Sequence, residues 1–328
     1  MDYRTIGKDP KTRRDVSVLS LGAMLFGTRT DEATSFEILD RYVEAGGTFV
    51  DTSNNYVFWE NGDQGGQSEA LLGRWRRSRG VGPEIVIATK LGARPLAPGT
   101  SYIDNPEGLS AKVIRESAER SRERLGVDKL DLLYAHIEDP TIPVQETVEG
   151  FAGLVAEGTV GLLGVSNHWT WRVERARTIA AARGLPGYEV LQYSHTYLRP
   201  RYDLRGDLSP DGNQGAVGGD LLSYLRAEPS LTLVAYSPLL GGRYVRDDKP
   251  MGLEFDHPGT PRRMKALGEV AKETGATVNQ VVLSYLIGGP LPVIPLVGAS
   301  SVAQLDESLG AVDLKLSADQ RARLDAAY

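Results

Sequence analysis

The chain has 328 residues, 41% of them hydrophobic and 24% charged, a formal net charge of -6, and no cysteine. Its length and composition suit one large α/β domain over residues 1–328 and exclude a disordered or fibrous chain. The negative charge argues against nucleic acid as a partner, and the absence of thiols excludes disulfides, thiolate metal sites and a cysteine nucleophile. The first residues lack the apolar core of a signal peptide, and no apolar run approaches the ~20 residues of a membrane span. We therefore expect a cytoplasmic protein with no membrane partner.

Eight short apolar runs recur along the chain, with helical patterns between them. In chain order they are VLSLGAM (18–24), TFV (48–50), IVIAT (85–89), LDLLYA (130–135), VGLLGV (160–165), YEVL (188–191), LTLVA (231–235) and PVIPLV (292–297). The clearest helical pattern places Val144, Val148, Phe151 and Val155 on one face. Eight near-continuously apolar strands alternating with helices favour a closed (β/α)8 TIM barrel over an open doubly wound sheet.

Helical patterns at 277–287 and 317–327 are surplus to the alternation and are predicted to be extra helices added to the barrel. The longest connections follow the runs at 85–89, 188–191 and 231–235. Loops after strands gather at the C-terminal mouth of a barrel, so these long loops predict a substrate lid or pocket wall there. For residues 205–219, a disordered surface insertion is an equally good interpretation.

Polar or phenolic residues follow six of the eight runs. They are Asp51, Lys90, His136, Ser166 with Asn167, Gln192, and Tyr236. Any one of them has an ordinary explanation, such as a helix cap or a satisfied core histidine. Six at one mouth, each from a different strand, predict a convergent polar site.

Asp51, Tyr56, Lys90 and His136 make chemical sense as a unit. A free tyrosine has a pKa of about 10, and an adjacent ammonium such as Lys90 lowers it by roughly one to three units. Asp51 would keep a buried Lys90 charged, and His136 can orient a carbonyl oxygen beside the Tyr56 hydroxyl. The group can protonate an oxyanion but contains no electron source, so a reduction would need hydride from a bound cofactor.

These residues lie in segments that resemble a known family. The segments are FVDTSNNY, GQSEALLGRW, IATKLG, LDLLYAHIED, EGTVGLLGVSN, VLQYS, VAYSPLLGG and VIPLVGASSVAQLDESL. Over nearly its whole length the chain resembles the aldo-keto reductases, specifically the bacterial branch similar to potassium-channel β subunits. The resemblance implies a (β/α)8 barrel, a nicotinamide cofactor bound without a Rossmann glycine fingerprint, and reversible reduction of a small carbonyl substrate.

The resemblance also implies roles for individual residues. Tyr56 would be the general acid, tuned by Lys90 and Asp51, and His136 would orient the carbonyl. The residues implied to contact the nicotinamide end and the pyrophosphate are Ser166, Asn167, Gln192, Tyr236, Ser237, Leu239 and Gly241. Those implied at the adenosine end are Gly298, Ser300, Gln304, Glu307 and Ser308.

Two further assignments follow from single residues. Trp59 is a candidate for the wall of the substrate pocket. An equally good interpretation is that Trp59 only packs under its loop. The remaining histidines, His168, His195 and His257, have no ligand spacing, so we expect no metal.

The cofactor expected is NADP(H), with NAD(H) also accepted. In similar proteins an arginine commonly follows the Gly-Ala pair and binds the 2′-phosphate, whereas Ser300 stands there in this chain. Residues 292–313 contain no lysine or arginine. The sequence thus predicts weak discrimination between the two cofactors.

Two other functions stay open at this stage. A regulatory or binding barrel similar to the channel β subunits would keep the four polar residues and react slowly. A Schiff-base lyase using Lys90 is disfavoured because Asp51 would keep the amine protonated. The sequence fixes neither the physiological substrate nor the oligomeric state.

Overall fold

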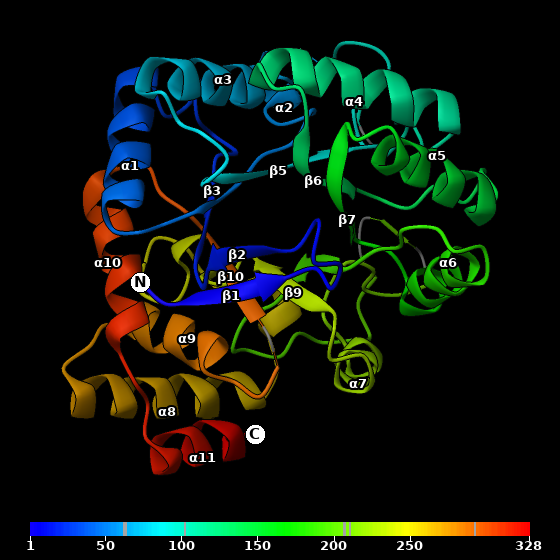
Figure 1. The fold of residues 1–328 in the computed structure, drawn as a ribbon. Helices are drawn as coiled ribbons and strands as arrows, with labels where there is room; N and C mark the ends of the chain where they lie inside the picture. The colour runs from blue at the N-terminus through cyan, green and yellow to red at the C-terminus, as the bar shows by residue number, and fades with distance from the viewer. Residues whose placement is uncertain (62–63, 102, 206–207, 210, 292) are drawn as a thin grey trace.

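The computed structural model describes residues 1–61, 64–101, 103–205, 208–209, 211–291 and 293–328. Eight parallel strands close into a barrel in the order β10-β3-β4-β5-β6-β7-β8-β9, and helices surround it (Figure 1). The predicted (β/α)8 barrel is therefore confirmed. Its strands read as continuous apolar runs because they are buried on both faces, as in β7, where every residue is buried.

All eight predicted runs overlap a barrel strand. The strands are β3 (Ser20–Gly22), β4 (Phe49–Asp51), β5 (Val86–Leu91), β6 (Leu130–Ala135), β7 (Val160–Ser166), β8 (Val190–Ser194), β9 (Thr232–Tyr236) and β10 (Val293–Gly298). Pro292, the first residue of the eighth predicted run, lies outside the described residues.

A hairpin that the sequence did not predict precedes the barrel. Strands β1 (Tyr3–Ile6) and β2 (Arg14–Ser17) pair antiparallel and are drawn in blue in Figure 1. Ile6 and Val16 belong to the same apolar cluster as the barrel-interior residues Phe49 and Val190. The hairpin therefore packs on the interior at the end opposite the mouth, which leaves the C-terminal end for a site.

The helices connect the strands and cover the barrel. They are α1 (Glu32–Glu44), α2 (Phe58–Asn61), α3 (Gln67–Arg79), α4 (Ala111–Leu125), α5 (Val144–Ala156), α6 (Thr170–Ala182), α7 (Gly219–Ala227), α8 (Gly259–Thr274), α9 (Val278–Ile287), α10 (Val302–Asp313) and α11 (Ala318–Ala326). None of those in the described part of the chain is long and apolar enough to cross a membrane.

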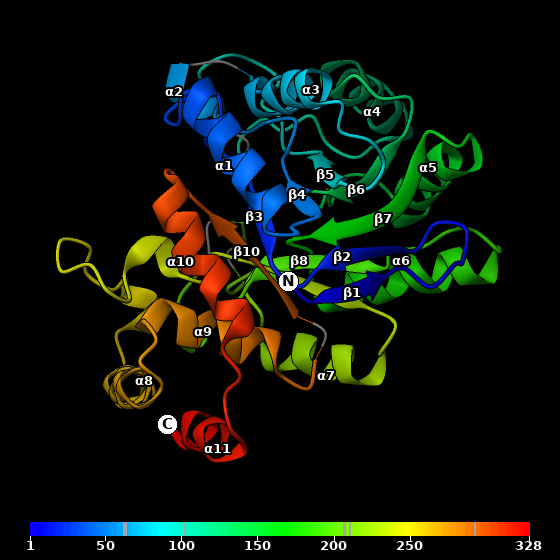
Figure 2. The same cartoon turned by 60° about the vertical axis from the view of Figure 1, so that its left-hand side comes forward.

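One assignment of the extra helices was wrong. The pattern at 277–287 forms α9, which packs against β10 and α10 and so belongs to the ring around the barrel. The additions are α8, which the sequence did not predict, and α11, the predicted pattern at 317–327. They pack on each other outside α9 (Figure 2). The burial of α9 fits this place in the ring. Seven of its ten residues are buried, because the barrel covers one side of the helix and α8 covers another.

The long loops follow β5, β8 and β9, as predicted. Described parts of 205–219 pack on the barrel: the Ser194 N–H donates to the Gly215 carbonyl at 2.8 Å, and the Val217 N–H donates to the Ser194 carbonyl at 3.0 Å. Gln214 Nε2 donates to the Asn167 carbonyl at 2.9 Å. These bonds favour a pocket wall over a disordered insertion for this part of the loop.

Candidate active site

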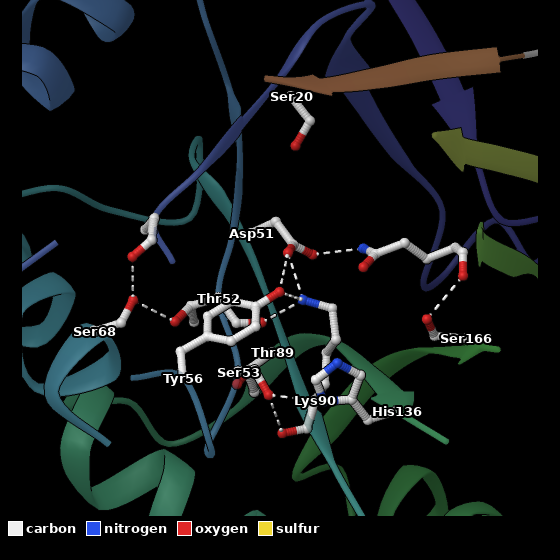
Figure 3. A network of polar contacts seen from close by, with 12 residues as sticks. Ser20, Asp51, Thr52, Ser53, Tyr56, Ser68, Thr89, Lys90, His136 and Ser166 are labelled. Atoms are coloured by element: carbon white, nitrogen blue, oxygen red, sulfur yellow. Dashed lines mark hydrogen bonds and ion pairs between the residues drawn. The ribbon is translucent and has the colours of Figure 1, made fainter. Parts of the chain in front are cut away.

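A buried ion pair lies at the C-terminal mouth of the barrel (Figure 3). Lys90 of β5 and Asp51 at the end of β4 are both fully buried and form a salt bridge. Lys90 Nζ also donates to the Thr52 carbonyl and to the Tyr56 hydroxyl, each at 2.7 Å. Three acceptors match the three hydrogens of an ammonium, so Lys90 has no lone pair for a Schiff base.

The electrostatics of this group differ in one respect from the sequence-based expectation. Burial, reinforced by the Asp51 carboxylate, raises the pKa of Tyr56 well above its ordinary value of 10. The prediction that Lys90 lowers this pKa is therefore wrong for the protein alone, because burial disfavours the phenolate more than one ammonium favours it. Burial also lowers the pKa of Lys90, and the negative charge of Asp51 acts in the opposite direction. At neutral pH Tyr56 thus carries the proton that a general acid needs.

His136 lies next to Tyr56 at the end of β6. The two rings meet edge-on, with centroids 6.0 Å apart. His136 Nδ1 is 3.1 Å from the Ser53 hydroxyl. Burial, with a contribution from Lys90, lowers the pKa of His136 well below its ordinary value of 6.5, so the imidazole is neutral at physiological pH.

A chain of hydrogen bonds extends from the ion pair across the mouth. Gln192 Nε2 donates to Asp51 Oδ2 at 2.8 Å, and Ser166 Oγ donates to the Gln192 carbonyl at 2.8 Å. Asn167 Nδ2 donates to Ser166 Oγ at 3.0 Å, and the Tyr236 hydroxyl donates to Asn167 Oδ1 at 2.9 Å. The structure therefore brings together the predicted residues that end β4 to β9.

A cavity of about 1110 Å³ opens beside Tyr236. It is lined by Ser237, Leu240 and Gly241 and by the long loops after β8 and β9. Its charged lining residues are Arg199, Arg205, Arg243, Lys249, Asp248 and Glu254. Leu239 lies in the same turn, where its carbonyl accepts from the Gly242 N–H at 2.9 Å. With four basic and two acidic side chains, the cavity favours an anionic ligand.

The residues predicted at the adenosine end lie where β10 passes into α10. Gly298, Ser300 and Gln304 are exposed, and Gln304 Oε1 accepts from the Ser300 N–H at 2.9 Å. Glu307 is turned toward α9, where it accepts from Thr277 Oγ1 at 2.8 Å. Ser308 is buried, and its hydroxyl donates to the Gln304 carbonyl at 3.2 Å.

Trp59 lies in the short helix α2, with 44% of its surface exposed. It contacts Phe58 edge-on at 5.0 Å. The neighbouring Glu60 forms a salt bridge of 2.6 Å with Arg29, which joins this segment to the loop after β3. Trp59 thus has an exposed aromatic face.

Sequence reasoning missed the residues that hold the loop carrying Tyr56. Buried Glu107, from the loop after β5, accepts from Asn54 Nδ2 and from the Gly92 N–H, each at 2.7 Å. Buried Ser53 and Asn55 connect the same loop to His136 and Ala93. The only sequence signal was the unusually polar run 52–55 between Asp51 and Tyr56.

We expect Gly65→Ala to lower the activity of this site by about tenfold or more, because the loop that carries Tyr56 packs closely on this glycine and a small displacement of a catalytic group is costly. Gly65 has φ +87°, and an added Cβ would lie 2.5 Å from the Asn55 carbonyl carbon. The matched control is Gly80→Ala, with φ +64° and no atom within 4 Å of the added Cβ. Both variants should lose about 1–2 kcal/mol of stability from the backbone, measured by urea unfolding. Equal activity in the two variants would contradict this role of the loop.

Among the residues that the structure describes, no group of three or more histidine or carboxylate side chains is placed to hold a metal ion.

Comparisons with known proteins agree with the fold and with the family resemblance. The sequence model of the Aldo/keto reductase family matches residues 18–328. Norsolorinic acid reductase from Aspergillus flavus is 31% identical over 327 residues, which cover 95% of this chain and 78% of that protein. An aryl-alcohol dehydrogenase (NADP+) from Phanerodontia chrysosporium is 29% identical over 334 residues, covering 93% and 80%. A thermostable aldo-keto reductase, crystallised with the inhibitor epalrestat, superposes with a TM-score of 0.74 at 24% identity over 100% of both chains.

The chain therefore belongs to the aldo-keto reductase family, as its sequence motifs predicted. It is an oxidoreductase enzyme of a family that reduces carbonyl groups and uses nicotinamide cofactors.

Proposed function

We propose that this protein is a single-domain NAD(P)H-dependent reductase that converts an aldehyde or ketone to an alcohol, with Tyr56 as its general acid. The observation that carries the proposal is the 2.7 Å contact between Lys90 Nζ and the Tyr56 hydroxyl, next to the buried Asp51. Because Lys90 donates to the phenol oxygen, the phenol hydrogen points away from Lys90. Its acceptor in the structure is Asp51 Oδ1 at the long distance of 3.5 Å, so a substrate oxygen can replace that weak contact.

Each residue of the group has a distinct task in this proposal. Tyr56 gives its proton to the carbonyl oxygen as negative charge develops there. Lys90 then stabilises the phenolate that remains, because its ammonium already donates to that oxygen. Asp51 keeps the ammonium charged, and His136 orients the substrate beside the phenol. The nicotinamide, when bound, supplies hydride to the carbonyl carbon.

The residues beside Tyr236 suit such a cofactor. Ser166, Asn167 and Gln192 offer the donors and acceptors that a carboxamide needs, and Tyr236 offers an aromatic face for stacking. Ser237, Leu239 and Gly241 would follow the pyrophosphate along the basic cavity, whose lining includes Arg243 and Lys249. The adenosine would contact the residues where β10 passes into α10, which are Gly298, Ser300, Gln304, Glu307 and Ser308.

We expect the enzyme to prefer NADPH over NADH by tenfold or less in kcat/KM. Ser300 and the start of α10 offer only neutral donors to a 2′-phosphate, and charge-assisted hydrogen bonds are about twice as strong. Arg41, which contacts α10, is already paired with Asp306 at 2.7 Å. Steady-state kinetics with both cofactors at moderate ionic strength measure the ratio.

The matched variant is Ser300→Arg, which restores a charged donor at this position. It should raise the NADPH preference by about tenfold or more, since a hydrogen bond to a charged group contributes about 1.5–3 kcal/mol. A wild-type preference of about a thousandfold, or no gain in Ser300→Arg, would mean that a basic residue of another loop, such as Arg243 or Arg262, binds the phosphate.

For the substrate, the aryl-alcohol dehydrogenase named above suggests aromatic carbonyl compounds, and the exposed indole of Trp59 would form an apolar pocket wall for them. Aromatic and small aliphatic aldehydes and ketones should be compared by following the nicotinamide absorbance. Rapid multiple turnover supports the reductase. Tight cofactor binding with no more than slow turnover on the whole panel would favour a regulatory barrel instead.

A further inference from the structure

One hydroxyl inside the barrel takes no part in the hydrogen-bond chain at the mouth. Tyr134 of β6 is fully buried, and its hydroxyl makes no hydrogen bond of ordinary geometry with the described residues. Most buried hydroxyls in proteins have a partner, because a buried polar group without one destabilises the fold. The hydroxyl of Tyr134 is therefore placed at a cost that its packing does not explain.

The ring of Tyr134 leads from the ion pair toward β8. In the register of the barrel, Tyr134 stands between Lys90 of β5 and Gly164 of β7. Lys90 Nζ lies 5.9 Å from the centroid of the ring. A Cβ on Gly164 would lie 2.3 Å from the ring, so the ring crosses the space that a side chain of β7 would fill. The polar groups that act on the hydroxyl there are the Asp51 carboxylate and the Gln192 amide.

The hydroxyl is a hydrogen-bond donor at neutral pH. Burial, reinforced by the Asp51 carboxylate, raises the pKa of Tyr134 well above its ordinary value of 10, and the Gln192 amide acts in the opposite direction. The phenol thus keeps its hydrogen, and a carboxylate is the stronger of the two acceptors beside it.

The natural acceptor, Asp51 Oδ2, is taken in the protein alone. Oδ1 of this carboxylate accepts from Lys90 and, at 3.5 Å, from Tyr56. Oδ2 accepts from Gln192 Nε2 at 2.8 Å. Gln192 is also proposed to bind the nicotinamide carboxamide, and an amide that turns to the cofactor leaves Oδ2. Burial already raises the pKa of Asp51, so the loss of this donor would favour the protonated carboxyl, which cannot hold Lys90 as an ammonium.

We propose that Tyr134 is a positioning residue: its hydroxyl donates to Asp51 Oδ2 when Gln192 turns to the nicotinamide, and so keeps the Asp51–Lys90 pair charged in the cofactor complex. This inference rests on the proposed nicotinamide site. Tyr134 acts through Asp51 and not on the substrate. The other titratable side chains that interact with the pair are Tyr56, Glu69 and His136, which the test leaves unchanged.

The test is the affinity for NADPH of the wild type and of Tyr134→Phe, measured by fluorescence titration from about pH 6 to about pH 8. At the upper end the wild type should bind about tenfold more tightly or better, the contribution of one hydrogen bond to a charged group. The ratio of the two affinities should shrink as pH falls, because Asp51 of the variant complex takes up a proton and no longer needs the donor. Ionisation of the cofactor itself cancels in this ratio.

Stability without cofactor separates this role from a purely structural one. Tyr134→Phe should unfold at the same urea concentration as the wild type or at a higher one, because the hydroxyl that it removes has no partner there. The matched control is Tyr42→Phe. Tyr42 is also fully buried, but its hydroxyl donates to the Leu19 carbonyl at 2.6 Å. This control should unfold at lower urea and bind NADPH with an affinity whose ratio to the wild type does not change with pH.

An affinity ratio for Tyr134→Phe that stays near one, or that does not change with pH, overturns the proposal. Failure of the wild type to bind either reduced cofactor would overturn it together with the nicotinamide site. The binding result does not depend on turnover. A protein that shows the expected pH-dependent ratio but reduces no carbonyl would support the role of Tyr134 and refute the reductase alone.

Discussion

Tyr56→Phe is expected to lower kcat for carbonyl reduction by about 10²- to 10⁴-fold, the usual contribution of a positioned general acid. The phenylalanine ring keeps the shape of the side chain but has no proton to give to the carbonyl oxygen. The cavity proposed to hold the cofactor lies beside Tyr236 and does not include residue 56 among its lining, so cofactor affinity should stay within a few-fold. Steady-state kinetics and a fluorescence titration with the reduced cofactor measure the two effects.

The matched control is Tyr224→Phe in α7. The Tyr224 hydroxyl donates to Glu174 and accepts from Arg177 on the helical ring, away from the mouth network. It should keep nearly full activity. If Tyr56→Phe retained more than about a tenth of the wild-type rate, the general acid would have to be another group.

Lys90→Met should reduce activity to a comparable extent, because the phenolate left by proton transfer loses its ammonium. It should also destabilise the fold by about 3–5 kcal/mol at neutral pH, since Asp51 stays buried without its cation. Burial already raises the pKa of Asp51, and removal of Lys90 raises it further. A raised folded-state pKa favours folding only while the carboxyl is protonated, so this variant should lose stability as pH rises from acid toward neutrality. Urea unfolding across this range, and the pH profile of kcat, measure these effects.

The double variant Lys90→Met/Asp51→Leu separates stability from catalysis. Replacing both charges by apolar groups removes the uncompensated carboxylate, so most of the lost stability should return while activity stays low. Activity in Lys90→Met with an unchanged pH profile would contradict the coupling between Lys90 and Tyr56.

The sequence was sufficient to predict the barrel because its strands are buried on both faces, which leaves eight apolar runs that no other arrangement of helices and strands explains as well. The hairpin of β1 and β2 was missed for the converse reason. Its strands are only four residues long and mix Arg4 and Arg14 with a few apolar residues. The alternation of polar and apolar residues is therefore too short to predict a strand. Helix α8 was missed, and α9 was assigned wrongly as an addition, because periodicity shows that a helix has an apolar face but not which neighbour covers that face.

Part of the site was equally predictable. Asp51, Lys90 and His136 stand directly after apolar runs, and parallel topology alone brings strand ends to one mouth. Ser53, Asn55 and Glu107 were missed, since they act through contacts between loops that have no repeating pattern. The sequence also could not predict that the pKa of Tyr56 is raised, because burial and neighbouring charges depend on packing in three dimensions.

The central claim is that hydride passes from a nicotinamide cofactor to a carbonyl carbon at this mouth, with Tyr56 supplying the proton. Its most direct test is a single-turnover reaction of the enzyme with a reduced cofactor carrying deuterium at the transferable position, followed by mass spectrometry of the product. The account predicts an alcohol with one deuterium on the former carbonyl carbon, formed by the wild type and at least about a hundredfold more slowly by Tyr56→Phe. An alcohol without deuterium, or equal rates in the two proteins, would contradict it.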